Sequence, residues 1–354
     1  MASPFSVKVE RNVPVPMRDG TILYADVYRP DAPGQFPALL QRTCYSKDLP
    51  LPTVVLVFPI TAASRGYAVV VQDVRGRYAS QGEFYPFRHE IEDGYDSVEW
   101  AAAQPWCDGN VGMYGGSYLG ATQWLAAIAR PPHLKAIFPS LTASDFYRGW
   151  AYQGGAFQLA FNEIWALLGL ALLDGVSRLG LSDEELAGEQ GKLAQAIDNF
   201  DETARFLPLK DFPHLQQPGL APYFYDWLAH PAHDDYWRRW SIETQHDQVS
   251  VPAFNLGAWY DIFLGGTLSN FVGMRKNGGS EQARRGQKLL VGPWYHNIPL
   301  DARVGDVSLP LRALLDLDGL HLRWFDYWLK GIDNGIGDEP PVEIFVMGEN
   351  VWRS

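Results

Sequence analysis

The most informative stretch of the sequence is Gly112-Met113-Tyr114-Gly115-Gly116-Ser117-Tyr118-Leu119-Gly120. An apolar run, Val111–Tyr114, leads into it, and a helical pattern, Tyr118–Ala129, follows it. A nucleophilic serine at a sharp strand-to-helix turn needs this context, because only small residues can pack around the strained turn. The stretch therefore indicates a nucleophile elbow at Ser117.

The glycine spacing around this serine departs from the common pattern Gly-x-Ser-x-Gly. Gly115 stands two residues before Ser117, as the pattern requires, but Leu119 stands two residues after it and Gly120 comes one residue later. A glycine-rich turn onto a helix, without a catalytic role, is the competing interpretation of this stretch alone.

Two later segments carry the side chains that a serine nucleophile needs. A serine hydroxyl is a weak nucleophile, so it requires a base and an acid that orients the base. The predicted strand Val251–Leu256 is followed by Asp261, and the strand Lys288–Val291 is followed by His296. Alone, Asp261 could cap a helix and His296 could be a hydrogen-bonded loop residue. Together with Ser117 they have the chain order of an α/β-hydrolase triad, at strand ends where active sites gather.

An oxyanion hole requires two donors aimed at the developing negative charge. The backbone N–H of Tyr118, the residue after the predicted nucleophile, is expected to be one. The other is expected in the loop after the strand Phe36–Gln41, where Tyr45 could donate through its phenol.

The rest of the chain predicts an α/β fold. It opens with an antiparallel pair, Phe5–Val9 and Thr21–Tyr28. Later strands are rich in Val, Leu and Phe without strict alternation, which is typical of a mainly parallel sheet buried on both faces. These strands are Phe36–Gln41, Tyr67–Gln72, Val111–Tyr114, Leu134–Phe138, Val251–Leu256 and Lys288–Val291, with helices at Glu90–Ala103, Tyr118–Ala129 and Leu320–Lys330.

The pattern of strands is interrupted between residues 143 and 249, where helical periodicity and many aromatic residues predict an inserted helical cap. Most of these aromatic side chains are expected to pack in a core, although some could face a pocket. The core is then expected to comprise residues 1–142 and 250–335. The remaining residues 336–354 read as a linker and one strand, Val342–Met347, which has no evident pairing partner.

Composition excludes several classes of function. The 354 residues contain 29 Lys or Arg and 41 Asp or Glu, a net charge of −12, without the clustered cations that nucleic-acid binding needs. With two cysteines there is no disulfide scaffold and no thiolate-rich zinc site. The longest apolar run, Ile164–Leu173, is too short for a membrane span, and no secretory signal opens the chain. We expect a soluble cytoplasmic protein with no metal or cofactor, whose partner is a small substrate.

Two further clusters have alternative interpretations. His230-Pro231-Ala232-His233-Asp234-Asp235 could suggest a metal site, but without a third group of ligands a helix N-terminus capped by acidic side chains is favoured. Asp73, Arg75 and Arg77 could bind an anionic substrate, but ion pairing that braces a loop is favoured.

Several of these motifs together resemble the cocaine esterase and X-Pro dipeptidyl-peptidase group of serine hydrolases, which also includes glutaryl acylases and α-amino acid ester hydrolases. The resemblance covers essentially the whole chain, and in this group the elbow is commonly Gly-x-Ser-Tyr-x-Gly, which this sequence matches. The residues that carry it are Arg18-Asp19-Gly20, Ala25–Pro30, Gln72–Gly76 with Ser80 and Gly82, Gly115–Gly120, Trp259-Tyr260-Asp261 and Gly292–His296.

The resemblance implies roles for particular residues. It implies Ser117, Asp261 and His296 as the triad and Tyr45 as an oxyanion donor, and it places Trp150, Trp165 and Phe263 where relatives line the acyl pocket. It also implies a C-terminal β jelly roll after the core and cap, of which only the first strand, Val342–Met347, would be present in a truncated chain.

The predicted activity is cleavage of an ester or amide acyl bond through an acyl-enzyme. One alternative is an X-Pro dipeptidyl-peptidase, which would need an acidic group for the free amine of its substrate; Asp145, Glu163 and Asp174 are available in the cap. The other is a hydrolase-fold protein whose catalysis is impaired by truncation.

Overall fold

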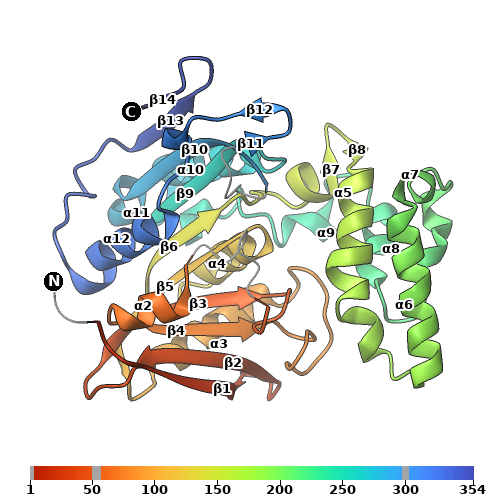
Figure 1. Cartoon of the computed structure of the whole chain (residues 1–354), viewed down its shortest axis with the longest axis horizontal. Coiled ribbons are helices and arrows are strands. Elements are labelled where there is room, and N and C mark those ends of the chain that lie inside the picture. The colour runs from red at the N-terminus through yellow and green to blue at the C-terminus, as the bar shows by residue number, and fades with distance from the viewer. Residues whose placement is uncertain (1–3, 50–56, 297–302) are drawn as a thin grey trace.

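The computed structural model describes residues 4–49, 57–296 and 303–354, and its centre is a ten-stranded sheet (Figure 1). The strand order is β1-β2-β4-β3-β5-β6-β9-β10-β13-β14. The strands are β1 (Val7–Pro16), β2 (Ile22–Pro30), β3 (Phe36–Thr43), β4 (Ala68–Asp73), β5 (Cys107–Gly116), β6 (Leu134–Ser140), β9 (Ala253–Tyr260), β10 (Gln287–Tyr295), β13 (Val342–Val346) and β14 (Val351–Arg353).

The sheet is parallel from β4 to β13, and antiparallel strands β1, β2 and β14 form its edges. Neighbouring residues of the central strands enter opposite cores: Val70 packs on one face, whereas Val69 and Val71 pack on the other. Burial on both faces explains why these strands are continuous apolar runs. The predicted α/β-hydrolase type of fold, with a mainly parallel sheet, is confirmed.

Helices cover both faces of the sheet. One face contacts α3 (Glu90–Ala102), α4 (Tyr118–Ile128) and α10 (Leu264–Asn277), and the other contacts α2 (Pro59–Ser64) and α12 (Leu317–Lys330). The short elements that remain outside the inserted segment are α11 (Glu281–Arg285), η7 (Leu311–Ala313) and the hairpin β11 (Arg303–Val304) with β12 (Val307–Ser308), whereas η6 (His246–Gln248) is the last element before β9. Within the described residues, every helix is too short or too polar to cross a lipid bilayer.

The segment between β6 and β9 is largely helical and lies to one side of the sheet, on the right of Figure 1. One hairpin of two-residue strands, β7 (Tyr152–Gln153) and β8 (Ala156–Phe157), is present although no strand is predicted there. The helices are η1 (Tyr147–Ala151), α5 (Leu159–Ile164), η2 (Trp165–Leu172), η3 (Gly175–Arg178), α6 (Asp183–Asp198), α7 (Phe200–Thr203), η4 (Leu209–Asp211), η5 (Pro213–Leu215), α8 (Pro222–Ala229) and α9 (Asp235–Arg238).

The C-terminal strand differs from its prediction. Val342–Met347 is predicted to lack a partner, but β13 pairs in parallel with β10, with Leu289 opposite Val342, and antiparallel with β14. The helix α12 supplies the crossover that parallel neighbours require, so β10, α12 and β13 form one βαβ unit. This strand therefore extends the main sheet, and its interpretation as the unpaired first strand of another domain is wrong.

Candidate active site

Ser117 stands at the turn between β5 and α4 in a strained backbone conformation, with φ +60° and ψ −124°. A Cβ on Gly115 would lie 2.6 Å from the Leu119 Cβ, and one on Gly120 would lie 2.8 Å from the Thr142 Cβ. Gly120 is therefore required where α4 passes the chain that follows β6, whereas Leu119 closes over Gly115. These contacts give a physical reason for the unusual glycine spacing.

The structure brings Ser117, His296 and Asp261 together from three strand ends. The His296 Nε2 lies 3.0 Å from the Ser117 Oγ, and the His296 Nδ1 lies 2.7 Å from the Asp261 Oδ1. The Asp261 side chain is fully buried, and 28% of the His296 side chain is exposed. In the tautomer with the proton on Nδ1, His296 donates to Asp261 and accepts from the serine hydroxyl.

The two predicted oxyanion donors flank this serine. Tyr118 is the first residue of α4, so its N–H has no partner within the helix. The Tyr45 hydroxyl accepts a 2.8 Å hydrogen bond from the Trp165 indole N–H, which leaves its proton free to be donated. Burial raises the pKa of Tyr45 well above its usual value, although the Ser117 hydroxyl and Trp165 act in the opposite direction. The phenol is therefore a neutral donor.

The loop that carries Tyr45 is braced by Asp73 and Arg77. The Asp73 carboxylate accepts the Lys47 N–H at 2.7 Å, and burial raises the pKa of Asp73 to about 6. The Arg77 guanidinium donates to the Cys44 carbonyl at 3.0 Å and to the Leu170 carbonyl at 2.9 Å. The predicted bracing role is confirmed, but the ion pairing differs, because Arg75 binds Asp19 and Asp93.

Trp150, Trp165 and Phe263 form one aromatic cluster beside the histidine. The ring of Phe263 lies 5.2 Å from that of His296 and stacks on Trp150 at 4.7 Å between ring centroids. Trp165 packs edge-on against Trp150 at 5.2 Å. The cluster of these three predicted pocket residues thus reaches His296 through Phe263. Phe161 joins the cluster at 5.6 Å from Trp150, a contact that the sequence could not separate from ordinary helix packing.

The histidines that suggested a metal site are paired with different carboxylates. His230 contacts Asp234 at 2.6 Å, and His233 contacts Asp145 at 3.0 Å. Asp234 caps α9 by accepting the Tyr236 N–H, as the favoured interpretation predicts. Across residues 4–49, 57–296 and 303–354, His, Cys, Asp and Glu side chains form no group that could hold a metal ion.

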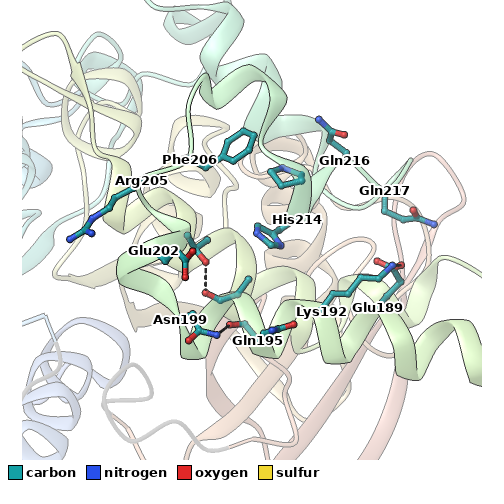
Figure 2. A pocket seen from close by; sticks show the side chains of 13 residues that line it. Glu189, Lys192, Gln195, Asn199, Glu202, Arg205, Phe206, His214, Gln216 and Gln217 are labelled. Atoms are coloured by element: carbon teal, nitrogen blue, oxygen red, sulfur yellow. Dashed lines mark hydrogen bonds and ion pairs between the residues drawn. The ribbon is translucent and has the colours of Figure 1, made fainter.

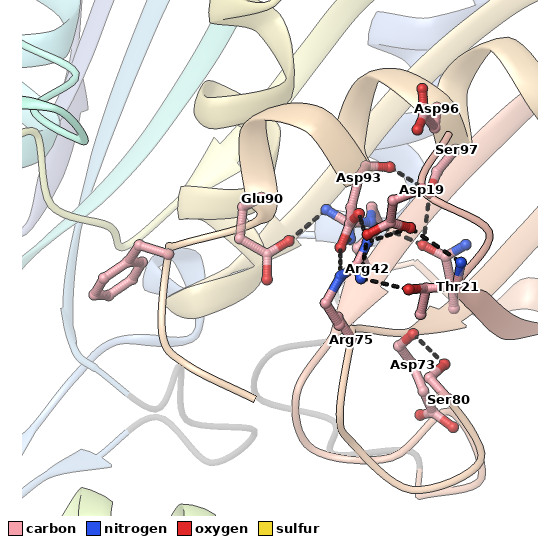
Figure 3. Close-up of polar contacts among 12 residues, drawn as sticks. Asp19, Thr21, Arg42, Asp73, Arg75, Ser80, Glu90, Asp93, Asp96 and Ser97 are labelled. Atoms are coloured by element: carbon pink, nitrogen blue, oxygen red, sulfur yellow. Dashed lines mark hydrogen bonds and ion pairs between the residues drawn. The ribbon is translucent and has the colours of Figure 1, made fainter. Parts of the chain in front are cut away.

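A buried polar network next to the elbow was missed by the sequence analysis (Figure 3). The Tyr118 hydroxyl donates to Glu90 at 2.8 Å, and Glu90 forms an ion pair with Arg42. The Arg42 side chain is fully buried, and 5% of the Glu90 side chain is exposed. No sequence signal joins these residues, because they lie on three separate elements.

The inserted segment also contains an open hollow of about 920 Å³, between α6 and the residues around His214 (Figure 2). Its polar lining includes Glu189 and Lys192, which pair with each other at 2.6 Å. None of Ser117, Asp261 and His296 lines it. The catalytic candidates therefore gather at the strand ends, away from this hollow.

Comparison with known proteins identifies relatives of the chain. The chain is 38% identical over 352 residues to the cocaine esterase of Rhodococcus sp. (strain MB1 Bresler), covering 98% of this chain and 59% of that protein. It resembles the structure of a CocE/NonD family hydrolase from Staphylococcus aureus, with a TM-score of 0.70, 26% identity, and coverage of 98% and 55%. It also resembles an α-amino acid ester hydrolase, with a TM-score of 0.70, 25% identity, and coverage of 99% and 58%. The chain thus spans less than two thirds of the length of these relatives.

The sequence pattern of one protein family matches most of the chain, from residue 19 to residue 297. This range includes Ser117, Asp261 and His296. The chain belongs to the X-Pro dipeptidyl-peptidase (S15) family.

Proposed function

We propose that this chain is a serine hydrolase that cleaves an ester or amide acyl bond through an acyl-enzyme. Ser117 attacks the carbonyl carbon while His296 takes its proton, and His296 then protonates the leaving alcohol or amine as the carbonyl re-forms. A water molecule, deprotonated by His296, attacks the acyl-enzyme and releases the acid and the free serine. Asp261 orients His296, and the Tyr45 phenol with the Tyr118 N–H stabilises the oxyanion.

One observation carries this proposal: a single imidazole joins a buried carboxylate and a serine hydroxyl. The 2.7 Å contact at Nδ1 and the 3.0 Å contact at Nε2 have the lengths that a general base and its orienting acid need. The strained backbone at Ser117 supports the same role, because strain of this kind gathers at functional sites.

An ester substrate is favoured over a dipeptidyl substrate by the state of the three acidic candidates for amine binding. Asp145 pairs with His233, and Asp174 accepts the Tyr78 N–H while it contacts Arg77. Both oxygens of Glu163 are buried, and neither has a hydrogen-bond partner among the residues that the structure describes. None of the three presents an unpaired, accessible carboxylate to a free amine. We therefore propose an esterase whose acyl group lies against Trp150, Trp165 and Phe263, beneath the inserted segment acting as a cap.

The test compares aryl esters with Xaa-Pro anilides as substrates. The wild-type chain is expected to hydrolyse aryl esters, and Ser117→Ala and His296→Ala to lower kcat by about 10⁴-fold or more. Ser140→Ala is a matched control, because the Ser140 hydroxyl is buried and has no hydrogen-bond partner in the described parts of the chain. It is expected to retain the wild-type rate.

Two other results would change the proposal. Turnover confined to Xaa-Pro anilides would identify a dipeptidyl-peptidase instead. Failure of the folded wild-type chain to hydrolyse either class would favour the other alternative, a hydrolase-fold protein whose catalysis is impaired.

A further inference from the structure

We propose that the buried Arg42–Glu90 ion pair positions the oxyanion hole by holding the side chain of Tyr118. This inference rests on the proposed hydrolase function, in which the Tyr118 backbone N–H is an oxyanion donor. The Tyr118 phenol extends from the start of α4 into the core, where it donates to the Glu90 Oε1 at 2.8 Å. The same oxygen of Tyr118 accepts the Phe87 N–H at 3.2 Å. Tyr118 is therefore held by its backbone in α4 and by the two hydrogen bonds of its phenol oxygen.

The loop that precedes α3 reinforces this anchor. Phe87 is a non-glycine residue with φ +68°, a strained conformation that persists only where the surroundings impose it. Its ring stacks on the ring of Tyr118 at 5.3 Å between centroids. The indole N–H of Trp165 binds Tyr45, the other proposed donor. The ring centroid of Trp165 lies 6.1 Å from that of Tyr118. The Tyr118 side chain is thus held by both polar and aromatic contacts.

Arg42 connects this anchor to the strand that carries the second donor. Arg42 lies in β3, three residues before Tyr45, and its Nε donates to the Gln72 Oε1 at 2.8 Å. Its ion pair with Glu90 therefore connects two elements. One is the strand that leads to Tyr45, and the other is α4, which is linked to Glu90 by the Tyr118 side chain and offers the backbone N–H. Oxyanion donors accelerate a reaction only when they are held in position before charge develops.

Keeping this ion pair in the core costs free energy of folding. Burying both charges requires their removal from water, and replacement by apolar residues is often neutral or stabilising. A second ion pair lies beside the first. Asp93 lies 4.0 Å from Arg42, and its two carboxylate oxygens accept from Arg75 at 2.6 and 2.9 Å. Arg75 also pairs with Asp19, which lies near the surface. Figure 3 shows these carboxylates converging on the two guanidinium groups.

The test uses Tyr118→Phe, which removes the phenol oxygen but leaves the ion pair and the backbone N–H. Tyr67→Phe is the matched control, because Tyr67 is also fully buried and its hydroxyl donates to the carboxylate of Asp326 at 2.6 Å, away from the triad. For each variant we would measure kcat and KM for an aryl ester, the inhibition constant of an arylboronic acid, which forms a charged tetrahedral adduct, and the melting temperature.

We expect Tyr118→Phe to lower kcat and weaken boronate inhibition, each by about tenfold, with KM unchanged. The loss is expected to be smaller than the ~10²–10³-fold loss of kcat on deletion of an oxyanion donor, because this donor is only displaced. Glu90→Gln should reproduce this pattern more weakly. Tyr67→Phe should lower the melting temperature without either kinetic effect. Positioning by the ion pair is refuted if Tyr118→Phe changes only the melting temperature, or if Tyr67→Phe gives the same kinetic losses. An inactive wild-type chain would instead refute the hydrolase function and this inference with it.

Discussion

Tyr45 differs from the other proposed oxyanion donor because it acts through a side chain, which a substitution can remove. Tyr45→Phe is expected to lower kcat for an aryl ester by about 10²–10³-fold with little change in KM, since the phenol would bind only the charge of the transition state. Steady-state kinetics check this. The control is Tyr225→Phe, because the Tyr225 hydroxyl donates to the Phe212 carbonyl within the inserted segment. Equal kinetics for Tyr45→Phe and the wild type would exclude Tyr45 as a donor.

Glu163 is fully buried, and within residues 4–49, 57–296 and 303–354 neither of its oxygens has a hydrogen-bond partner. Burial raises the pKa of Glu163 to about 7. Between about pH 4.5 and 7, this carboxyl is therefore protonated in the folded chain and ionised in the unfolded chain. The stabilising effect of this proton is complete at low pH and is lost as the pH rises to 7. Each pKa unit corresponds to about 1.4 kcal/mol.

Glu163→Gln is therefore expected to raise the free energy of unfolding at pH 8, by up to about 3 kcal/mol, and to change it little at pH 4.5. Urea denaturation at the two pH values measures this. The control is Glu185→Gln, since Glu185 is exposed and the pKa of Glu185 is lowered by its bonds to Ser182. The same effect of Glu163→Gln at both pH values would contradict the account of this carboxyl.

The meeting of the three residues of the proposed triad could be predicted from the sequence, because each has a local signal. Ser117 has a glycine-rich turn, and Asp261 and His296 each follow an apolar strand, so chain order alone indicates their meeting. Arg42 and Glu90 have no such signal. They are charged residues in buried segments, 48 residues apart, and only the packing of α3 against the sheet brings them together.

At the level of elements, the approach of α4 to β6 controls the geometry of the elbow. Gly120→Ala would place a methyl group 2.8 Å from the Thr142 Cβ and 3.0 Å from the Ser140 carbonyl oxygen. Overpacking of this kind typically costs about 1–3 kcal/mol, so we expect a lower free energy of unfolding and a lower kcat.

Gly188→Ala provides the matched control, because Gly188 is an exposed residue of α6 and no atom of the described residues lies within 4 Å of its added Cβ. It is expected to stabilise the chain by about 0.5–1 kcal/mol, because alanine favours the helix. Thermal and chemical denaturation of both variants measure the difference. Tolerance of Gly120→Ala without loss of stability or activity would show that α4 can move away from β6.

Elements with strong periodicity were predicted well, and those defined by distant pairing were not. The parallel strands appear as apolar runs because both faces are buried. The strand β13 was misinterpreted because its partner, β10, lies more than fifty residues earlier and is separated from it by α12. Sequence shows a strand's composition, whereas its place in the sheet depends on the whole fold.

For the whole molecule, Arg77 joins the core to the inserted segment. It is buried, donates to the Cys44 carbonyl in the core and to the Leu170 carbonyl in η2, and contacts the carboxylate of Asp174 at 3.6 Å. Arg77→Met is expected to lower the free energy of unfolding by about 3 kcal/mol or more, because it leaves buried polar groups unpaired. It should also speed proteolysis of the inserted segment.

Urea denaturation and limited proteolysis check this expectation, with Arg148→Met as the control. Arg148 pairs with Glu243 at an exposed position, where such pairs contribute little. If Arg77→Met and Arg148→Met behaved alike, Arg77 would not join the two parts of the chain.

The most direct test of the whole account is mass spectrometry of the chain after reaction with a fluorophosphonate, a reagent that phosphonylates activated serines. The account predicts one added phosphonyl group, located by peptide mapping on Ser117, and no labelling of Ser117→Ala or His296→Ala. Labelling of another serine, or equal labelling of wild type and Ser117→Ala, would contradict the proposed nucleophile.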